Sequence, residues 1–366
     1  MKLDYQKMLS FVQCVLPQFR VTRQRNLALL ALGISKVRDG HLTVSEIARY
    51  IPSSSDHWYK FKRIKRFLAN LKWSPAQQFV PLTRFCLQRF YPGADLPVII
   101  DQSTIKGRWE VLWASIPFRG RALPIAFRLF RYQDLAQLRI ESQNRLERDF
   151  IKQVLNLLPS QPRVIFLFDR GYARASLLRF LRQLKVRYVI RARKNLWVQC
   201  GHTFSGTLDQ IQMPAGAQYW WPHTICHREQ HCLVNLVITH DARASEPWYL
   251  LTNLQRASTA VHYYERRFRC EELFRDLKDQ LHLETIRLWH TQRVARLLFG
   301  IVVLYYALTL IGASAQQRGL RSKVCKDKVS LAWMALRLLN MPYLLKTNLL
   351  LHALYHSRWS LSYESG

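Results

Sequence analysis

The order of strand-like and helix-like segments between residues 93 and 194 limits the possible folds more than any other feature of the sequence. Short apolar runs typical of strands alternate there with longer stretches of helical periodicity. The expected strands cover residues 97–100, 110–117, 122–130, 164–168 and 186–191, and the expected helices cover residues 141–158 and 173–184. We therefore predict an α/β core in which an antiparallel meander of three strands is followed by two strands, each preceded by a helix.

Two of the expected strands end on an aspartate. Asp101 follows the first strand and Asp169 follows the fourth. The order of elements is that of an RNase H-like core, in which these strands are parallel neighbours, so both carboxylates are expected at one edge of the sheet. Two like charges a few ångströms apart are unfavourable unless a cation lies between them, and Mg²⁺ prefers carboxylate oxygens. The alternative is that each aspartate only caps a helix or forms a turn.

A third carboxylate lies in the polar stretch from residue 264 to residue 278. Four residues of this stretch fall within an arc of about 60° on a regular α-helix. They are Tyr264, Arg267, Glu271 and Lys278. Such a face can stack on a base, clamp a phosphate and hold a metal ion through Glu271, whereas Glu272 falls about 100° further round the helix. Arg275 lies on the same face and is predicted to contact DNA. The alternative is a solvated helix with an ion pair between Arg267 and Glu271.

The chain carries a large positive charge. Its 366 residues include 55 Lys and Arg against 24 Asp and Glu, a formal net charge of +31. Nucleic acid is the best candidate for the anionic partner, because each neutralised phosphate releases counterions. A basic helix that begins near Asp56, after a short break, suits a helix-turn-helix entering a DNA groove. Lys60 and Arg63 of that helix are therefore predicted to contact DNA. The alternative is an ordinary helical bundle with a basic exposed face.

A second basic cluster follows the fifth strand. Arg191, Arg193 and Lys194 are predicted to contact DNA phosphates, because this strand should end near the edge of the sheet that carries the aspartates. The alternative is a solvated basic loop.

The cysteines and the apolar stretches bear on where the chain works. Seven cysteines at irregular spacing do not suggest a disulfide framework, which favours a reducing cytoplasm. The N-terminus lacks the pattern of a signal peptide. Residues 297–317 carry no charge and approach the length of a membrane span. We expect a helix buried in a large core instead, and no membrane partner, because this stretch stands alone and follows a polar helix.

Composition divides the chain into five regions. Residues 1–92 are expected to form a helical DNA-binding domain, and residues 93–194 the first part of the core. Residues 195–254 combine glycines and tryptophans with alternating apolar patterns, which indicates a β-rich insertion. Residues 255–310 are expected to return to the core with the third carboxylate and the apolar helix. Residues 311–366 are predicted to form a helical C-terminal region.

The chain resembles bacterial insertion-sequence transposases of the DDE superfamily, in the branch with a Tyr-Arg-Glu-Lys signature, the insertion sequence four family. The resemblance rests on Asp101 within Val-Ile-Ile-Asp-Gln-Ser, Asp169 within Phe-Asp-Arg-Gly-Tyr, and Glu271 within the signature at its full spacing. It implies a retroviral-integrase-like RNase H core in which these three residues bind two Mg²⁺ ions, with Mn²⁺ as a substitute. It also implies that the other signature residues grip phosphates of the transposon end, namely Tyr264, Arg267 and Lys278.

The resemblance further implies cut-and-paste transposition. Water activated between two metal ions would hydrolyse the phosphodiester at the transposon end, and the freed 3′-hydroxyl would attack a second phosphodiester. Family members cut the second strand through a hairpin, with a flipped base received by an aromatic side chain of the insertion. The expected partners are double-stranded DNA, as terminal inverted repeats and as target, and a second copy of the chain in a homodimer at the bacterial nucleoid. The alternatives are an RNase H-like endonuclease without strand transfer and a non-catalytic DNA-binding protein derived from a transposase.

Overall fold

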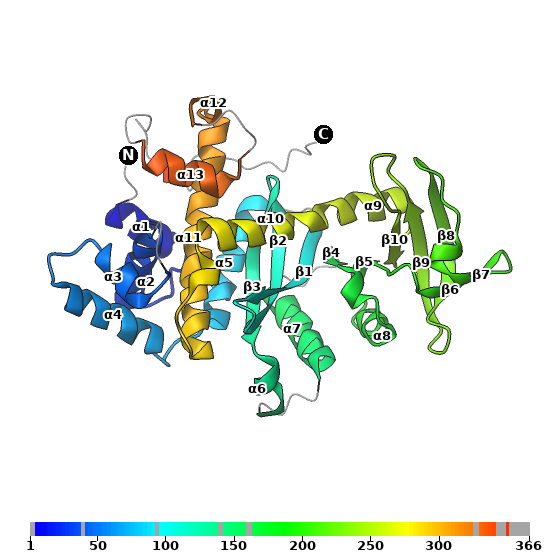
Figure 1. Ribbon diagram of the computed structural model, residues 1–366, viewed down its shortest axis with the longest axis horizontal. Coiled ribbons are helices and arrows are strands. Elements are labelled where there is room, and N and C mark those ends of the chain that lie inside the picture. Colours follow the sequence, from blue (N-terminus) through cyan, green and yellow to red (C-terminus); the bar gives the residue numbers. More distant parts are fainter. Residues whose placement is uncertain are drawn as a thin grey trace.

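A ten-stranded mixed sheet forms the centre of the molecule (Figure 1). The computed structural model describes residues 4–37, 41–91, 95–137, 142–158, 163–324, 329–341 and 349–350. The strands are β1 (Leu96–Ile105), β2 (Trp109–Phe118), β3 (Arg121–Phe130), β4 (Val164–Phe168), β5 (Arg187–Arg191), β6 (Trp197–Cys200), β7 (Phe204–Thr207), β8 (Gln218–Cys226), β9 (Cys232–Thr239) and β10 (Trp248–Thr252). Their spatial order is β3-β2-β1-β4-β5-β10-β9-β8-β6-β7.

The first five strands have the order and directions that the sequence predicts. β1, β2 and β3 form an antiparallel meander, and β1 pairs in parallel with β4, which pairs in parallel with β5. The helices between them are α6 (Tyr132–Gln137) and α7 (Gln143–Leu157) before β4, and the short η1 (Arg170–Tyr172) and α8 (Ala175–Gln183) before β5. The predicted helix at 141–158 corresponds to α7, although residue 141 lies outside the described residues.

Strand β1 is longer than the sequence predicts. The expected strand ends before Asp101, but β1 continues to Ile105. Its parallel pairing with β4 ends at Ile100 opposite Phe168, whereas its antiparallel pairing with β2 continues from Asp101 to Ile105. The polar run from Gln102 to Thr104 interrupts the apolar pattern, which is why the sequence places the strand end too early.

The five strands between residues 197 and 252 continue the same sheet. β10 pairs antiparallel with β5 on one side and with β9 on the other, so β6 to β9 extend outward from the core (Figure 1). Thr252 lies opposite Val189, and its hydroxyl donates a hydrogen bond to the Tyr188 carbonyl oxygen. The short η2 (Leu208–Gln210) follows β7. These pairings connect the β-rich stretch to the strands that carry the predicted site.

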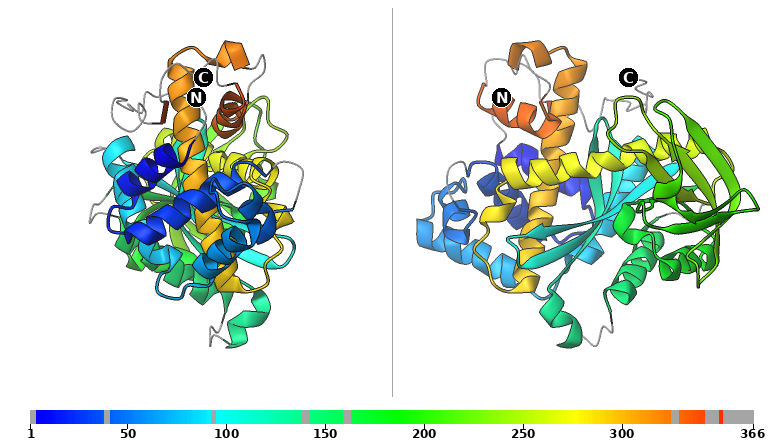
Figure 2. Two further views of the ribbon diagram at one scale, coloured as in Figure 1. Left: turned by 90° about the vertical axis from the view of Figure 1, so that its left-hand side faces the viewer. Right: turned by 45° about the vertical axis from the view of Figure 1, so that its right-hand side comes forward.

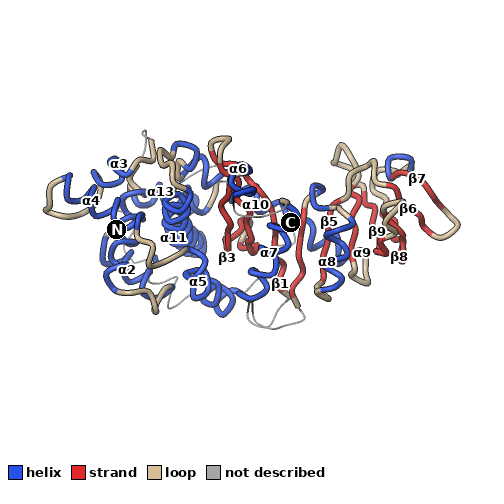
Figure 3. Tube along the Cα trace, turned by 90° about the horizontal axis from the view of Figure 1, so that it is seen from below, coloured by secondary structure: helices blue, strands red, loops and turns tan. Residues whose placement is uncertain are grey.

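Helices gather at the opposite end of the molecule (Figures 1 and 3). They are α1 (Tyr5–Val15), α2 (Val21–Ile34), α3 (Val44–Arg49), α4 (His57–Ala69), α5 (Pro75–Phe90), α11 (Thr291–Gln317), α12 (Arg321–Val324) and α13 (Leu331–Leu339). The long α11 stands between α1 to α4 and the sheet (Figure 2), and it contacts α2, α4, α5, α13 and β3. Helix α5 lies on the sheet side of α11 and packs directly against β3. Most of the predicted C-terminal region beyond residue 341 lies outside the described residues.

The apolar helix α11 is an interior element of the fold. By length and composition it is the one helix among the described residues that could cross a membrane, but 94% of its apolar window is buried inside the protein. Two glycines allow close packing along it. A Cβ at Gly300 would lie 2.5 Å from Leu30 Cδ2, and one at Gly312 would lie 2.1 Å from the Leu331 carbonyl oxygen. Both distances are shorter than van der Waals contact. At Gly312 the neighbour is backbone, so only glycine fits there, whereas a larger residue at Gly300 would have to displace the Leu30 side chain.

Candidate active site

The two strand-end aspartates meet as the sequence predicts. Ile100 lies opposite Phe168 in the parallel register of β1 and β4, so the next residue on each strand, Asp101 and Asp169, reaches the same level of the sheet. Both carboxylates approach one nitrogen, Nη2 of Arg267, at 3.0 Å from Asp101 and 3.7 Å from Asp169. The signature arginine therefore bridges the two strands.

Glu271 completes this arrangement from the other side of the guanidinium. Its Oε1 accepts a hydrogen bond of 2.5 Å from Arg267 Nη1. The side chain of Glu271 is 51% exposed, whereas those of Arg267 and Asp101 are 8% and 13% exposed. Glu272 instead faces away and pairs with Arg121 at 2.6 Å, so the choice of Glu271 over Glu272 agrees with the geometry.

Burial and the neighbouring charges control the ionisation of this cluster. Burial raises the pKa of the Asp101 carboxyl, and the Arg267 guanidinium opposes that rise. Burial lowers the pKa of Arg267, but the carboxylates of Asp101 and Asp169 more than offset this, so its pKa lies above the ordinary value. Asp101 and Arg267 form a buried ion pair, and each charge compensates the burial of the other.

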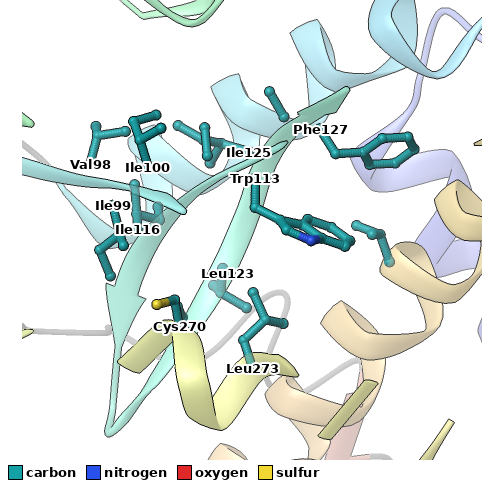
Figure 4. Packing of buried hydrophobic residues seen from close by; sticks show 14 of the residues in the cluster. Val98, Ile99, Ile100, Trp113, Ile116, Leu123, Ile125, Phe127, Cys270 and Leu273 are labelled. Atoms are coloured by element: carbon teal, nitrogen blue, oxygen red, sulfur yellow. The ribbon is translucent and has the colours of Figure 1, made fainter. Parts of the chain in front are cut away.

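Cys270 is a member of the site that the sequence did not reveal. Its Sγ lies 3.0 Å from Asp101 Oδ2 as a hydrogen-bond donor, and the residue is fully buried. Burial raises the pKa of the thiol, and the adjacent Asp101 carboxylate raises it further, so the sulfur keeps its proton. The backbone N–H of Gln102 donates to the other oxygen, Asp101 Oδ1, at 2.9 Å. Figure 4 shows Cys270 and Leu273 pointing from their helix toward the strands.

The stretch from residue 257 to residue 280 departs from the expected regular α-helix. It consists of α9 (Ala257–Glu265), a 3-10 turn η3 (Arg266–Phe268), α10 (Arg269–Arg275) and a π-helical turn η4 (Asp276–Gln280). Each change of helix type shifts the angular position of the residues that follow. The prediction of one shared face is therefore wrong in detail, although Arg267 and Glu271 remain neighbours.

Two signature residues lie elsewhere than predicted. Tyr264 is fully buried, 5.2 Å from the ring of Trp248 and 6.0 Å from that of Phe268, instead of on an exposed face. Among the described residues its hydroxyl has no hydrogen-bond partner. Lys278 lies in the π-helical turn and forms an ion pair with Glu284 at 2.9 Å. Tyr264 thus supports the site by packing, and Lys278 connects it to the short η5 (Leu283–Thr285).

The remaining predicted DNA contacts are spread over the surface. Arg275 is 64% exposed and pairs with Glu272 at 3.0 Å. Arg191 is mostly buried and pairs with Glu246. Arg193 and Lys194 are exposed between β5 and β6, Lys60 is half-buried on α4, and Arg63 is exposed with its Nε bonded to Asn26 Oδ1 at 2.7 Å. Arg191 reaches the level of Asp169, because Ile190 lies opposite Phe168 in the parallel register of β4 and β5. Lys60 and Arg63 lie on α4 at the other end of the molecule (Figure 1), so the whole set does not form one cluster with the carboxylates.

A buried ion network holds α10 against the sheet. Arg121 at the start of β3 contacts Glu272 through Nη1 and Asp276 through Nε, at 2.6 and 3.4 Å. Asp276 is 4% exposed, and burial raises its pKa, while a hydrogen bond from Ser330 opposes the rise. The partners are far apart in sequence, so the pattern of residues alone could not identify Arg121. Its position fixes the rotation of the helix that carries Glu271.

The carboxylates fit a hard divalent cation. Among the described residues no group of three or more His, Cys, Asp or Glu side chains is already placed as a metal cluster. However, Asp101 and Asp169 converge on a single cationic nitrogen, and carboxylate oxygens are the donors that Mg²⁺ and Mn²⁺ prefer. Glu271 is half-exposed beside them and can turn from Arg267 toward an ion. These three residues could hold the metal that the sequence predicts.

Comparison with known proteins identifies the class of the chain. Residues 118–307, more than half of the sequence, match the family described as "Transposase DDE domain". The matched stretch contains Asp169 and Glu271, and Asp101 lies before it. No curated protein matches the chain. The chain belongs to the DDE transposase domain family and therefore carries an enzyme domain of the transposase class. Membership of this family implies an RNase H-like core and divalent metal ions.

Proposed function

We propose that this protein is a cut-and-paste transposase of the insertion sequence four branch, with Asp101, Asp169 and Glu271 as its catalytic carboxylates. The observation that carries the proposal is the convergence of all three on the guanidinium of Arg267, from β1, β4 and α10. The Tyr-Arg-Glu-Lys signature at full spacing supports the choice of branch.

The side chains around the carboxylates prepare the site for chemistry. Asp101, Asp169 and Glu271 would hold Mg²⁺ or Mn²⁺, which when bound supplies an activated oxygen nucleophile and stabilises the leaving oxygen. Cys270 and the Gln102 amide fix the orientation of the Asp101 carboxylate before any ligand arrives. Arg267 offsets the mutual repulsion of the carboxylates.

The contacts to DNA are assigned by exposure. Arg275, Arg193, Lys194, Arg63 and Lys60 present charge at or near the surface and would bind phosphates of the terminal repeats or the target. Tyr264 and Arg267 are buried and would act indirectly, Tyr264 by packing against Trp248 and Arg267 by pairing with the carboxylates. Arg191 and Lys278 are ion-paired and would exchange their carboxylate partners for phosphate.

The same proposal includes two finer steps. Second-strand cleavage would proceed through a DNA hairpin, and two copies of the chain would bring two transposon ends together on the nucleoid. Residues 1–92 would bind the ends, and residues 195–254 would hold the distorted strand. The hairpin step is proposed because the chain has the Tyr-Arg-Glu-Lys signature. The dimer is proposed because two transposon ends must be brought together.

Incubation of the protein with Mg²⁺ and DNA bearing the inverted repeats that flank its gene tests this function. We expect cleavage at the repeat ends and joining to a target plasmid, both abolished by Glu271→Ala. Cutting without joining would favour a nuclease with the same core. An alanine variant as active as the parent would refute the assignment of Glu271, and DNA binding without any cutting would indicate a non-catalytic derivative.

A further inference from the structure

An exposed tryptophan marks a surface between the basic helix α4, which the sequence predicts to enter a DNA groove, and the carboxylates. Trp289 lies in the loop between η5 and α11 and is 67% exposed, which is rare for so large an apolar side chain. The guanidinium of Arg108, in the β1–β2 turn, lies 4.6 Å from the centre of the Trp289 ring and 5.1 Å from that of the buried Trp109. Arg108 is therefore held between two indoles, with its charge fixed near the surface.

The same loop is anchored to the strand that carries Asp101. The Lys106 backbone N–H donates to Glu284 Oε2 at 2.6 Å, and Lys106 Nζ donates to the Ile286 carbonyl oxygen at 3.1 Å. Glu284 also pairs with Lys278. These contacts tie the β1–β2 turn, the signature lysine and the Trp289 loop into one connected unit.

On its other side the loop faces α3 and α4. A cavity of about 250 Å³ lies between them, with Arg287 and Arg293 on one wall and Phe61 and Lys65 on the other. In the described part of the chain, Arg287, Arg293 and Lys65 form no ion pair, so their charges are available to a ligand. We call Lys65, Arg108, Arg287, Trp289 and Arg293 the bridging surface.

The charge of this region identifies the kind of partner. The sequence has no Asp or Glu from residue 57 to residue 94, which includes α4, and none from residue 285 to residue 326. The nearest acid in the Trp289 loop is Glu284, and it is already paired with Lys278. A surface with four cationic side chains and one exposed indole complements the phosphates of a duplex, which carries one charge per about 1.7 Å of axis. An apolar partner or a second basic copy of this chain would leave those charges unneutralised.

We propose that the bridging surface binds the backbone of duplex DNA between α4 and the cleavage site, with Trp289 packed against a sugar or a groove edge. The inference rests on the proposed function, since it places the same DNA. Lys106 is five residues from Asp101 along β1, or about 17 Å. A duplex that runs along β1 has a rise of about 3.4 Å per base pair, so the contact falls about five base pairs from the cut.

Salt-dependent binding tests this surface without requiring catalysis. Affinity for a terminal-repeat duplex is measured by fluorescence anisotropy, with Ca²⁺ in place of Mg²⁺, over a series of salt concentrations. The slope of log K against log salt is negative, and each lost phosphate contact makes it shallower by about 0.9. Arg287→Gln with Arg293→Gln should therefore make the slope shallower by about 1.8. Trp289→Ala should weaken binding several-fold with an unchanged slope, because it removes no charge.

The matched control changes two exposed basic residues on and after α8, Arg182→Gln with Lys185→Gln, and should leave slope and affinity as in the parent. If the Arg287→Gln, Arg293→Gln variant behaves like this control, the inference is wrong. The inference is also wrong if this double variant changes the sedimentation of the free protein but not its DNA binding. That result would indicate an interface between copies of the chain. If the unmodified protein binds DNA with the expected salt slope but does not cut it, the proposed function alone is refuted. If the unmodified protein cuts DNA and the Arg287→Gln, Arg293→Gln variant keeps the full slope, this inference alone is refuted.

Discussion

Replacement of Arg267 by glutamine tests how the carboxylate cluster is held together. Within the described residues, the substitution removes the one cation that contacts Asp101, Asp169 and Glu271. Asp101 would keep the Cys270 thiol and the Gln102 amide as donors. Its buried carboxylate would then lack a compensating charge.

The size of the effect follows from the burial of each partner. Removal of one member of a buried ion pair typically costs about 3–5 kcal/mol, because the other charge stays buried and unpaired. That cost applies to Asp101, whose side chain is 13% exposed. Glu271 is 51% exposed, and its ion pair contributes at most about 1 kcal/mol. We therefore expect Arg267→Gln to lower the free energy of unfolding by about 3–5 kcal/mol, almost all of it through Asp101.

Urea denaturation in the presence of a chelator, followed by tryptophan fluorescence, measures this change as a lower midpoint at unchanged slope. Glu271→Gln is the matched control, because it should abolish DNA cleavage yet cost less than about 1 kcal/mol. Arg267→Lys should fall between the two, since a single ammonium cannot serve carboxylates on both ends of the guanidinium fork. An Arg267→Gln protein as stable as the parent would show that Arg267 does not compensate the buried charge of Asp101.

Two further substitutions test the positions around the site. Arg121→Gln should lower the free energy of unfolding by about 3 kcal/mol in urea denaturation, because it leaves the buried Asp276 carboxylate without its cationic partner. The same variant should cleave DNA more slowly, and Arg121→Lys should recover part of the rate. A normal cleavage rate in Arg121→Gln would show that Arg121 does not orient α10. Cys270→Ser should keep the hydrogen bond to Asp101 and most of the cleavage rate. Cys270→Val removes the donor at similar volume and should reduce the cleavage rate at least tenfold, which corresponds to about 1.4 kcal/mol in activation free energy. Equal rates in both variants would contradict the role of Cys270.

The core could be predicted because its information is local in the sequence. Apolar runs, their order and the aspartates that follow them are enough to bring Asp101 and Asp169 to one edge, and about 100° per residue separates Glu271 from Glu272. Those expectations agree with the pairing of β1 with β4 and with the contacts of Arg267.

The parts that escaped prediction depend on tertiary contacts. Regular helix geometry places Lys278 beside Glu271, but the π-helical turn at 276–280 redirects it to Glu284. The Arg121–Glu272 pair joins residues 151 positions apart. The end of β1 is set by its pairing with β2 and not by its own polar residues. In each case packing against a distant element overrides the local pattern.

Metal-directed cleavage of the polypeptide shows whether Asp101, Asp169 and Glu271 bind the same ion. Fe²⁺ bound in place of Mg²⁺, with ascorbate and peroxide, generates radicals that cut the chain next to the ion, and mass spectrometry locates the cuts. The account predicts cuts near residues 101, 169 and 271 together, suppressed by excess Mg²⁺ and weakened by Asp101→Asn. Cuts confined to other parts of the chain, or cuts near only one of these residues that Mg²⁺ does not suppress, would contradict it.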